Sequence, residues 1–164
     1  MEKNTGSRIA EERQDFGYYL SNISHSIQQY FNRLYDQVGI TYPQSRLLTY
    51  LYRKEDQAEK GEPNNVNQRE LERALGIKAS SVSSLVRNLE AKGFIKSERI
   101  ESDTRNKRIL LTEKAYEIDA VIAQAVDETE KALTGGMSQE EVSTLLGLLR
   151  VLMDNVKALS DDQE

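Results

Sequence analysis

Residues 68–93, QRELERALGIKASSVSSLVRNLEAKG, decide the fold, because they hold two short amphipathic segments separated by three residues. The first predicts a helix over 68–75, with Leu71 and Leu75 four positions apart and Gly76 as its stop signal. The second predicts a helix over 79–92, whose apolar residues recur at helical spacing: Val82, Leu85, Val86 and Leu89. A helix, a tight turn and a second helix in this order predict a helix-turn-helix.

Two β-prone runs follow directly, at residues 94–100 and 107–111, and a polar segment at 101–106 joins them. This pattern predicts a β-hairpin. A hairpin immediately after a helix-turn-helix is the order of a winged helix-turn-helix, in which the hairpin is the wing.

Long helical patterns lie on both sides of this segment. Apolar residues repeat at steps of three and four from about residue 11 to residue 38. A second helix is predicted to start at Thr41, with Pro43 in its first turn, and to run out in the charged stretch that begins at Arg53. Residues 53–66 are therefore expected to form a long loop.

The C-terminal third predicts two more helices. Thr112 is placed to cap a long helix that ends at Gly135-Gly136, and Ser138 with Glu141 forms the pattern of a capping box at the start of the last helix. This last helix is apolar around too much of its circumference to be covered by one neighbour. In a chain of 164 residues, a second copy of the chain is the expected second neighbour.

The sequence thus predicts a mainly α protein: a winged helix-turn-helix with a small β-hairpin wing, flanked by long N- and C-terminal dimerisation helices. The expected domain organisation is an N-terminal dimerisation helix over 1–38, a winged helix-turn-helix over 39–114, and C-terminal dimerisation helices over 115–164.

The helix over 79–92 carries the first functional signal. Opposite its apolar stripe lie Ser80, Ser84 and Arg87, with Ser81 and Ser83 on the flanks. Small hydroxyl side chains allow close approach to a major groove, and Arg suits guanine or phosphate. Serine is a mediocre helix former, so its frequency here favours DNA contact over a merely solvated face, although a serine-rich polar surface is the alternative.

The wing carries the second signal. Arg105, Lys107 and Arg108 place three cations at the tip and on the returning strand, and a narrow minor groove attracts inserted Arg. Asp103, two residues before Arg105, is placed to hold its guanidinium. Asp103, Arg105, Lys107 and Arg108 are therefore the wing residues expected to serve DNA binding.

The net charge of −5 conceals this basic segment. Between residues 67 and 114 there are eleven Lys and Arg against seven Asp and Glu, a net of +4, whereas the rest of the chain carries −9. An acidic average is therefore compatible with one basic, DNA-facing surface.

Composition excludes several other classes. The chain has no Cys and only one His, so thiol chemistry, disulfides and a multi-histidine metal site are not expected. No phosphate loop or nucleophile–base pair is evident, so we expect neither catalytic residues nor a cofactor. The polar start of the chain and the lack of a long apolar run predict no secretory signal and no membrane partner, which favours the cytoplasm.

The residues resemble those of the MarR-type winged-helix transcriptional regulators. The resemblance covers nearly the whole chain and is carried by short segments in order and spacing: Gly39-Ile40-Thr41-Tyr42-Pro43-Gln44, Gln68-Arg69-Glu70-Leu71, Leu75-Gly76-Ile77, residues 80–93, Asp103 with Arg105, and Ile109-Leu110-Leu111-Thr112. It implies a homodimer with the second motif helix in a major groove and Arg105 in the adjacent minor groove. It also implies a repressor released by a small, often aromatic or phenolic, effector.

The expected function is therefore that of a homodimeric, sequence-specific regulator of transcription bound to a pseudo-palindromic double-stranded DNA operator. The effector-binding residues are not identifiable from the sequence. The alternative is a winged-helix module that binds another protein and not DNA.

Overall fold

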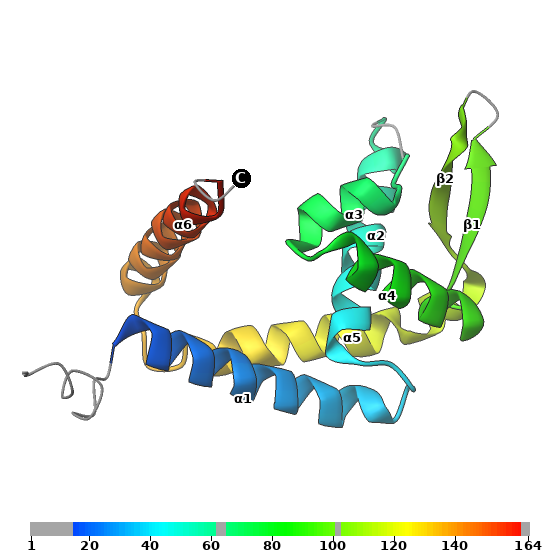
Figure 1. The fold of residues 1–164 in the computed structure, drawn as a ribbon. Helices are drawn as coiled ribbons and strands as arrows, with labels where there is room; N and C mark the ends of the chain where they lie inside the picture. The colour runs from blue at the N-terminus through cyan, green and yellow to red at the C-terminus, as the bar shows by residue number, and fades with distance from the viewer. Residues whose placement is uncertain (1–14, 62–64, 101–102, 162–164) are drawn as a thin grey trace, which may run out of the picture. The chain divides into compact units, whose positions relative to one another are not determined.

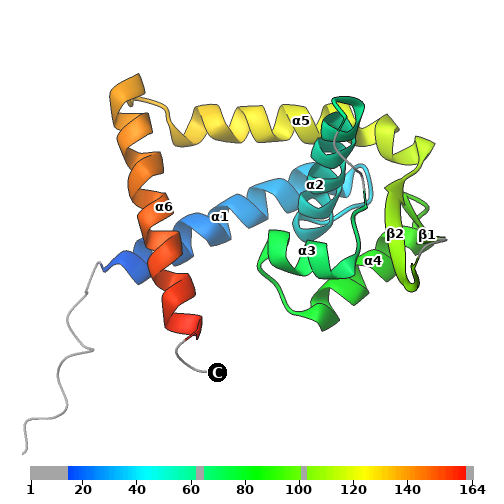
Figure 2. The ribbon, with the colours of Figure 1, turned by 90° about the horizontal axis from the view of Figure 1, so that it is seen from above.

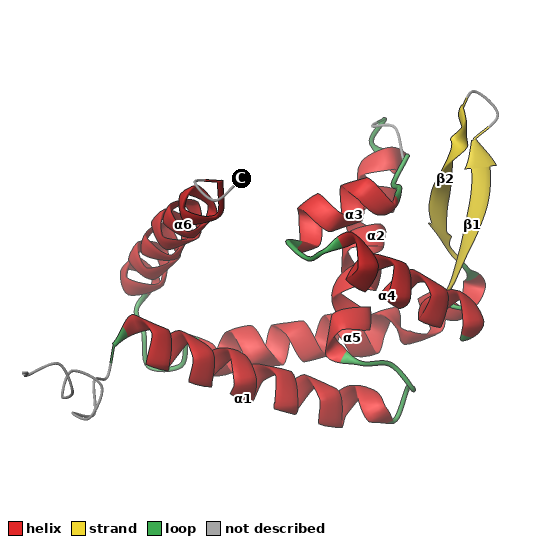
Figure 3. Ribbon diagram, viewed as in Figure 1, coloured by secondary structure: helices red, strands yellow, loops and turns green. Residues whose placement is uncertain are grey.

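The structure, a computed structural model, describes residues 15–61, 65–100 and 103–161. Within these ranges, six helices and two strands follow one another (Figures 1 and 2): α1 Phe16–Asp36, α2 Tyr42–Glu59, α3 Gln68–Leu75, α4 Ala79–Ala91, β1 Ile95–Ile100, β2 Asp103–Leu111, α5 Glu113–Leu133 and α6 Gln139–Asp161. The strands of the described part form one antiparallel hairpin among helices (Figure 3). The mainly α winged helix-turn-helix is thus confirmed.

The chain divides into two compact units, Met1–Ala125 and Val126–Glu164. The first holds the helix-turn-helix, the hairpin, α1, α2 and the beginning of α5. The second holds the remainder of α5 and all of α6. Each unit is described by itself below.

The start of α2 forms as the sequence predicts. Thr41 is extended and precedes the helix, Pro43 lies in its first turn, and the Thr41 N–H donates to Gln44 Oε1 at 3.0 Å. Proline is tolerated at this position because its missing N–H has no partner in the first turn of a helix.

The expected long loop over 53–66 is wrong, because α2 continues to Glu59. The charged segment is helical for two reasons. Lys60 Nζ pairs with Asp56 at 2.6 Å along the helix, and two tyrosines fasten the segment to α5. The Tyr52 hydroxyl donates to the Ala115 carbonyl at 2.5 Å, and the Tyr116 hydroxyl donates to Glu55.

The hairpin is longer than predicted, since β2 begins at Asp103 and not at Lys107. Ile95 pairs with Leu111 and Arg99 with Lys107, and the register shifts between Arg99 and Ile100. Pairing extends into the polar segment because each backbone N–H and C=O that joins the ladder gains a partner.

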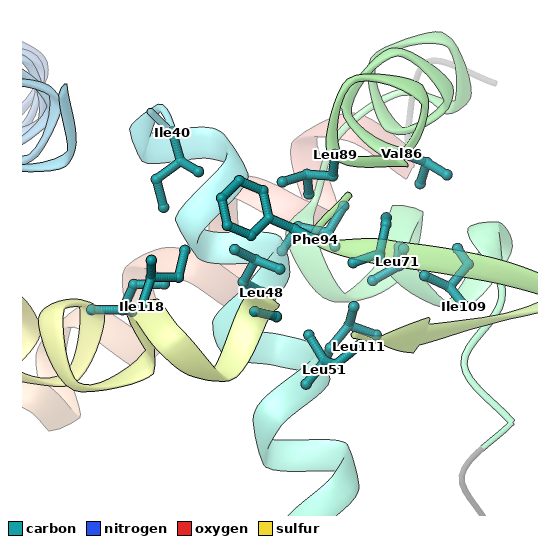
Figure 4. Packing of buried hydrophobic residues seen from close by; sticks show 14 of the residues in the cluster. Ile40, Leu48, Leu51, Leu71, Val86, Leu89, Phe94, Ile109, Leu111 and Ile118 are labelled. Carbon is teal, nitrogen blue, oxygen red and sulfur yellow. The ribbon is translucent and has the colours of Figure 1, made fainter. Parts of the chain in front are cut away.

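One hydrophobic core holds the first unit together. Phe94 lies close to Leu48 and Leu89 in its centre (Figure 4), and the side chains of Leu48 and Leu89 are fully buried. Leu71 from α3 and Ile118 from α5 belong to the same cluster. The predicted inner face of the second motif helix is confirmed, since its apolar residues pack here.

Thr112 directly precedes α5, the helix that the sequence predicts it to cap. Its hydroxyl hydrogen-bonds to the Gly93 and Phe94 carbonyls at 2.7 and 3.1 Å, which ties the start of α5 to the turn after α4. Ser138 fulfils its prediction: its N–H donates to Glu141 Oε2 at 2.7 Å, and its hydroxyl accepts the Glu141 N–H at 3.3 Å.

Helix α6 carries the broad apolar surface that its sequence predicts. Six of its large apolar side chains are exposed: Leu145, Leu146, Leu148, Val151, Met153 and Val156. Among the described residues, no helix has the length and apolar character needed to cross a membrane.

Candidate nucleic-acid interface

The turn between α3 and α4 is set by Gly76. Asn67 caps α3 by accepting the Glu70 N–H at 3.1 Å. At the other end Gly76 takes a left-handed conformation, φ +65°, and its N–H donates to the Glu72 carbonyl at 3.0 Å. Glycine suits this position because it has no Cβ to clash in the left-handed region. The resulting turn fixes the direction in which α4 leaves.

Helix α4 starts on the main chain. Lys78 precedes it without a side-chain cap, and its carbonyl accepts the N–H groups of Ser81 and Val82 at 2.9 and 3.1 Å. No serine hydroxyl is needed to start the helix, so Ser80 and Ser81 are exposed at its first turn.

The exposed face of α4 holds four of the five residues predicted for this helix. Ser80, Ser81, Ser84 and Arg87 are exposed, while Val82, Val86 and Leu89 face the core. Ser83 differs, because it is half-buried and its hydroxyl donates to Gln68 Oε1 of α3 at 3.1 Å. Its described hydrogen bond therefore joins the two helices of the motif.

On the wing, Arg108 belongs to a small charge network. Glu98, opposite it in the hairpin, pairs with Arg108 at 3.4 Å and with Lys96 at 2.8 Å. The hydrogen bond from Lys96 is the main reason that the pKa of Glu98 lies below its ordinary value, and Arg108 adds to the effect. Arg108 is thus partly committed to the hairpin itself.

Lys107 is exposed and lies opposite exposed Arg99 in the hairpin register. Neither has an acidic partner within 4 Å among the described residues. Sequence reasoning missed Arg99, since only the strand register reveals that it faces Lys107. The side chains of Asp103 and Arg105 lie outside the described residues, although both belong to β2.

Helix α3 is held to α2 by a polar cluster. The Tyr50 hydroxyl donates to Glu70 Oε1 at 2.7 Å, and Lys54 Nζ lies 3.5 Å from the same oxygen. Partial burial, followed by the hydrogen bond to the negative Glu70, raises the pKa of Tyr50 to about 12. The cluster fixes the first helix of the motif on its support.

An open hollow of about 540 Å³ lies between α2 and α5. Its lining consists of two aromatic rings, four carboxylates and one guanidinium: Tyr52, Tyr116, Glu55, Asp56, Glu59, Asp119 and Arg53. Within the described ranges, no three His, Asp or Glu residues are grouped so that they could hold a metal ion. The single histidine, His25, contacts Gln29 at 2.8 Å on the surface of α1.

Comparison with known proteins shows which family model this chain matches and which solved structures it is similar to. Residues 38–106 match the model of the MarR family. The fold is similar to that of S. aureus MepR in complex with DNA, with a TM-score of 0.79 and 27% identity over 89% of this chain and 99% of the other. It is also similar to the transcription regulator MarR from Oenococcus oeni PSU-1, with a TM-score of 0.70 and 27% identity over 85% and 99%. The transcriptional regulator SlyA, 19% identical over 92% and 99% with a TM-score of 0.80, shares the fold.

Proposed function

We propose that this chain, whose winged-helix segment belongs to the MarR family, is a homodimeric, sequence-specific DNA-binding regulator of transcription. The observation that carries the proposal is the exposed face of α4, where Ser80, Ser84 and Arg87 stand free of the core. Short hydroxyl side chains with one Arg suit the floor of a major groove. The similar fold of S. aureus MepR, which was solved in complex with DNA, supports DNA binding by this chain.

In this mode α4 enters a major groove, and the wing contacts the adjacent minor groove or its phosphates. Lys107 and Arg99 support the second contact, because two exposed cations opposite each other repel and gain from an anion between them. Arg105 is proposed as the residue that enters the minor groove, on the basis of the sequence.

A second copy of the chain is the proposed partner of the flanking helices. Phe16, Leu20 and Ile23 on α1 are exposed, as are Leu148 and Met153 on α6. Exposed apolar surface of this kind marks an interaction site. Two copies related by a two-fold axis read a pseudo-palindromic operator whose half-site centres are about 34–36 Å apart.

The regulatory role is proposed as repression relieved by a small effector. The hollow between α2 and α5 supports ligand binding, since it offers the faces of Tyr52 and Tyr116. Its carboxylates disfavour aromatic acids there and leave neutral phenols or cations as the compatible chemistry. A thermal-shift screen that compares matched aromatic acids, phenols and amines tests this, and stabilisation by the acids alone would contradict it.

The DNA proposal is tested by fluorescence anisotropy with the duplex that lies upstream of the chain's own coding sequence. We expect tight binding to this duplex, weaker binding to a shuffled duplex of equal length, and affinity that falls steeply with salt as condensed counterions are released. Equal, weak binding to both duplexes would instead favour the alternative, a winged-helix module for a protein partner.

A further inference from the structure

Lys92 links the end of α4 to a distant part of the chain. It follows the last residue of the helix, and its ammonium group donates to the Gly39 carbonyl at 2.7 Å and to Gln44 Oε1 at 3.0 Å. Gly39 lies in the turn between α1 and α2, and Gln44 lies in the first turn of α2. One side chain therefore joins the end of α4 to the α1–α2 turn.

Gln44 is built into this link. Its side chain is buried, and the same Oε1 atom accepts both the Thr41 N–H and the Lys92 ammonium, each at 3.0 Å. An amide oxygen has two lone pairs, so these two bonds saturate it. The atom that stabilises the start of α2 is thus the atom that receives Lys92.

A second lysine holds the same turn from the side of α5. Lys114 Nζ donates to the Lys92 carbonyl at 2.7 Å and lies 4.7 Å from the centre of the Phe94 ring. The Thr112 hydroxyl donates to the neighbouring Gly93 carbonyl, so two hydrogen bonds from the start of α5 hold the turn that follows α4. The end of α4 is therefore held by directional bonds from two sides, whereas apolar contacts alone are non-directional.

We propose that Lys92 is a positioning residue that sets the orientation of α4 against the α1–α2 turn and thereby the DNA affinity, without contacting DNA. The inference rests on the proposed function. Lys92 and Ser80 are separated by about 18 Å along the helix axis, at 1.5 Å per residue. The ammonium is engaged by two protein acceptors at the opposite end of α4 from the serines.

The first test measures operator affinity against salt for Lys92→Met, Lys92→Arg and the matched control Lys60→Met. Among the described residues, the ammonium of Lys60 pairs with Asp56 on its own helix. Lys92→Met is expected to raise Kd about five- to tenfold, the equivalent of one net hydrogen bond. For Lys92→Met, the slope of log Kd against log salt should stay unchanged. Lys92→Arg and the control Lys60→Met should both keep the Kd of the unmodified chain. An unchanged Kd, or a slope that falls by about 0.9 as for a lost phosphate contact, would overturn the proposal.

The second test needs no DNA. In Lys92→Met, amide hydrogen exchange is expected to accelerate together at Thr41, which bonds to Gln44, and at Phe94, which closes the turn after α4, but not in α6. Acceleration confined to the end of α4 refutes the link between the two turns. Because exchange is measured on the free protein, failure of the link is distinguished from failure of DNA binding.

Discussion

Arg99 and Lys107 lie opposite each other across the β-hairpin, and both side chains are exposed. Like charges in this position destabilise an antiparallel pair. One pair further along, Arg108 and Lys96 share Glu98, whereas Arg99 and Lys107 have no acidic partner within 4 Å among the described residues. Arg99 and Lys107 are therefore the described wing cations that we propose for contact with a phosphate backbone.

Lys107→Ala is expected to weaken operator binding and to lower the slope of log Kd against log salt by about 0.9, as for one lost phosphate contact. The hairpin itself loses a repulsion, so the free energy of unfolding should not fall. Arg108→Ala is the matched comparison and should change the slope less, because Glu98 already pairs with that guanidinium. Equal slopes for Lys107→Ala and the unmodified chain would remove Lys107 from the interface.

Arg105→Ala is expected to cost about 1–3 kcal/mol of specific binding, if its guanidinium enters the minor groove. Anisotropy titration against the operator measures the loss, and thermal unfolding checks that the fold is kept. Arg53→Ala, on the exposed side of α2, is the control of equal charge. Undiminished affinity in a folded Arg105→Ala variant would contradict the assignment.

Ser83 and Ser84 are neighbours with opposite surroundings, which makes them a matched pair. Both alanine variants gain the same helix propensity, but only Ser83→Ala loses the hydrogen bond to Gln68. Urea unfolding should therefore show Ser83→Ala to be less stable than Ser84→Ala by about 0.5–1.5 kcal/mol. DNA titration should show the reverse order, with the larger loss for the exposed Ser84.

Gly76→Ala is expected to lower the free energy of unfolding by about 1–2 kcal/mol, the cost of a Cβ in the left-handed conformation. No atom lies within 4 Å of the added Cβ, so the cost is conformational and not steric crowding by neighbours. Gly76→Asn should cost less, because asparagine tolerates this conformation better. Equal losses in urea unfolding for the two variants would contradict this origin.

Stability is expected to fall above pH 10. Partial burial, with hydrogen bonds to Glu70 and Glu55 respectively, raises the pKa of Tyr50 and Tyr116 to about 12 from the ordinary 10. Below pH 10 the Tyr50 and Tyr116 hydroxyls are protonated in both the folded and the unfolded chain, so their contribution to stability is complete. Between pH 10 and 12 the unfolded chain loses these protons first, and the free energy of unfolding declines. The free energy of unfolding, measured with urea from pH 9 to 11, should decline less steeply for Tyr50→Phe and Tyr116→Phe than for the unmodified chain. Parallel curves for the variants and the unmodified chain would refute the contribution of these two hydroxyls.

The sequence by itself determined the local elements and the resemblance of residues 38–106 to the MarR family. Helical periodicity, the position of Gly76 and the Ser138–Glu141 pair act within a few residues, so the order of helices, the turn and the last cap follow from nearest neighbours. The composition of α4 likewise separates an inner apolar face from an outer serine face without knowledge of the remaining chain.

The tertiary structure decided what depends on partners distant in sequence. Helix α2 extends to Glu59, where Glu55 meets a tyrosine 61 positions away, and the wing gains Arg99 only through strand register. In the sequence, Lys92 cannot be told apart from other surface lysines. Only the structure shows that its ammonium donates to the carbonyl of Gly39, 53 positions earlier. Hydrogen bonds and charge pairs act at contact distance, and only the folded chain sets which residues come into contact.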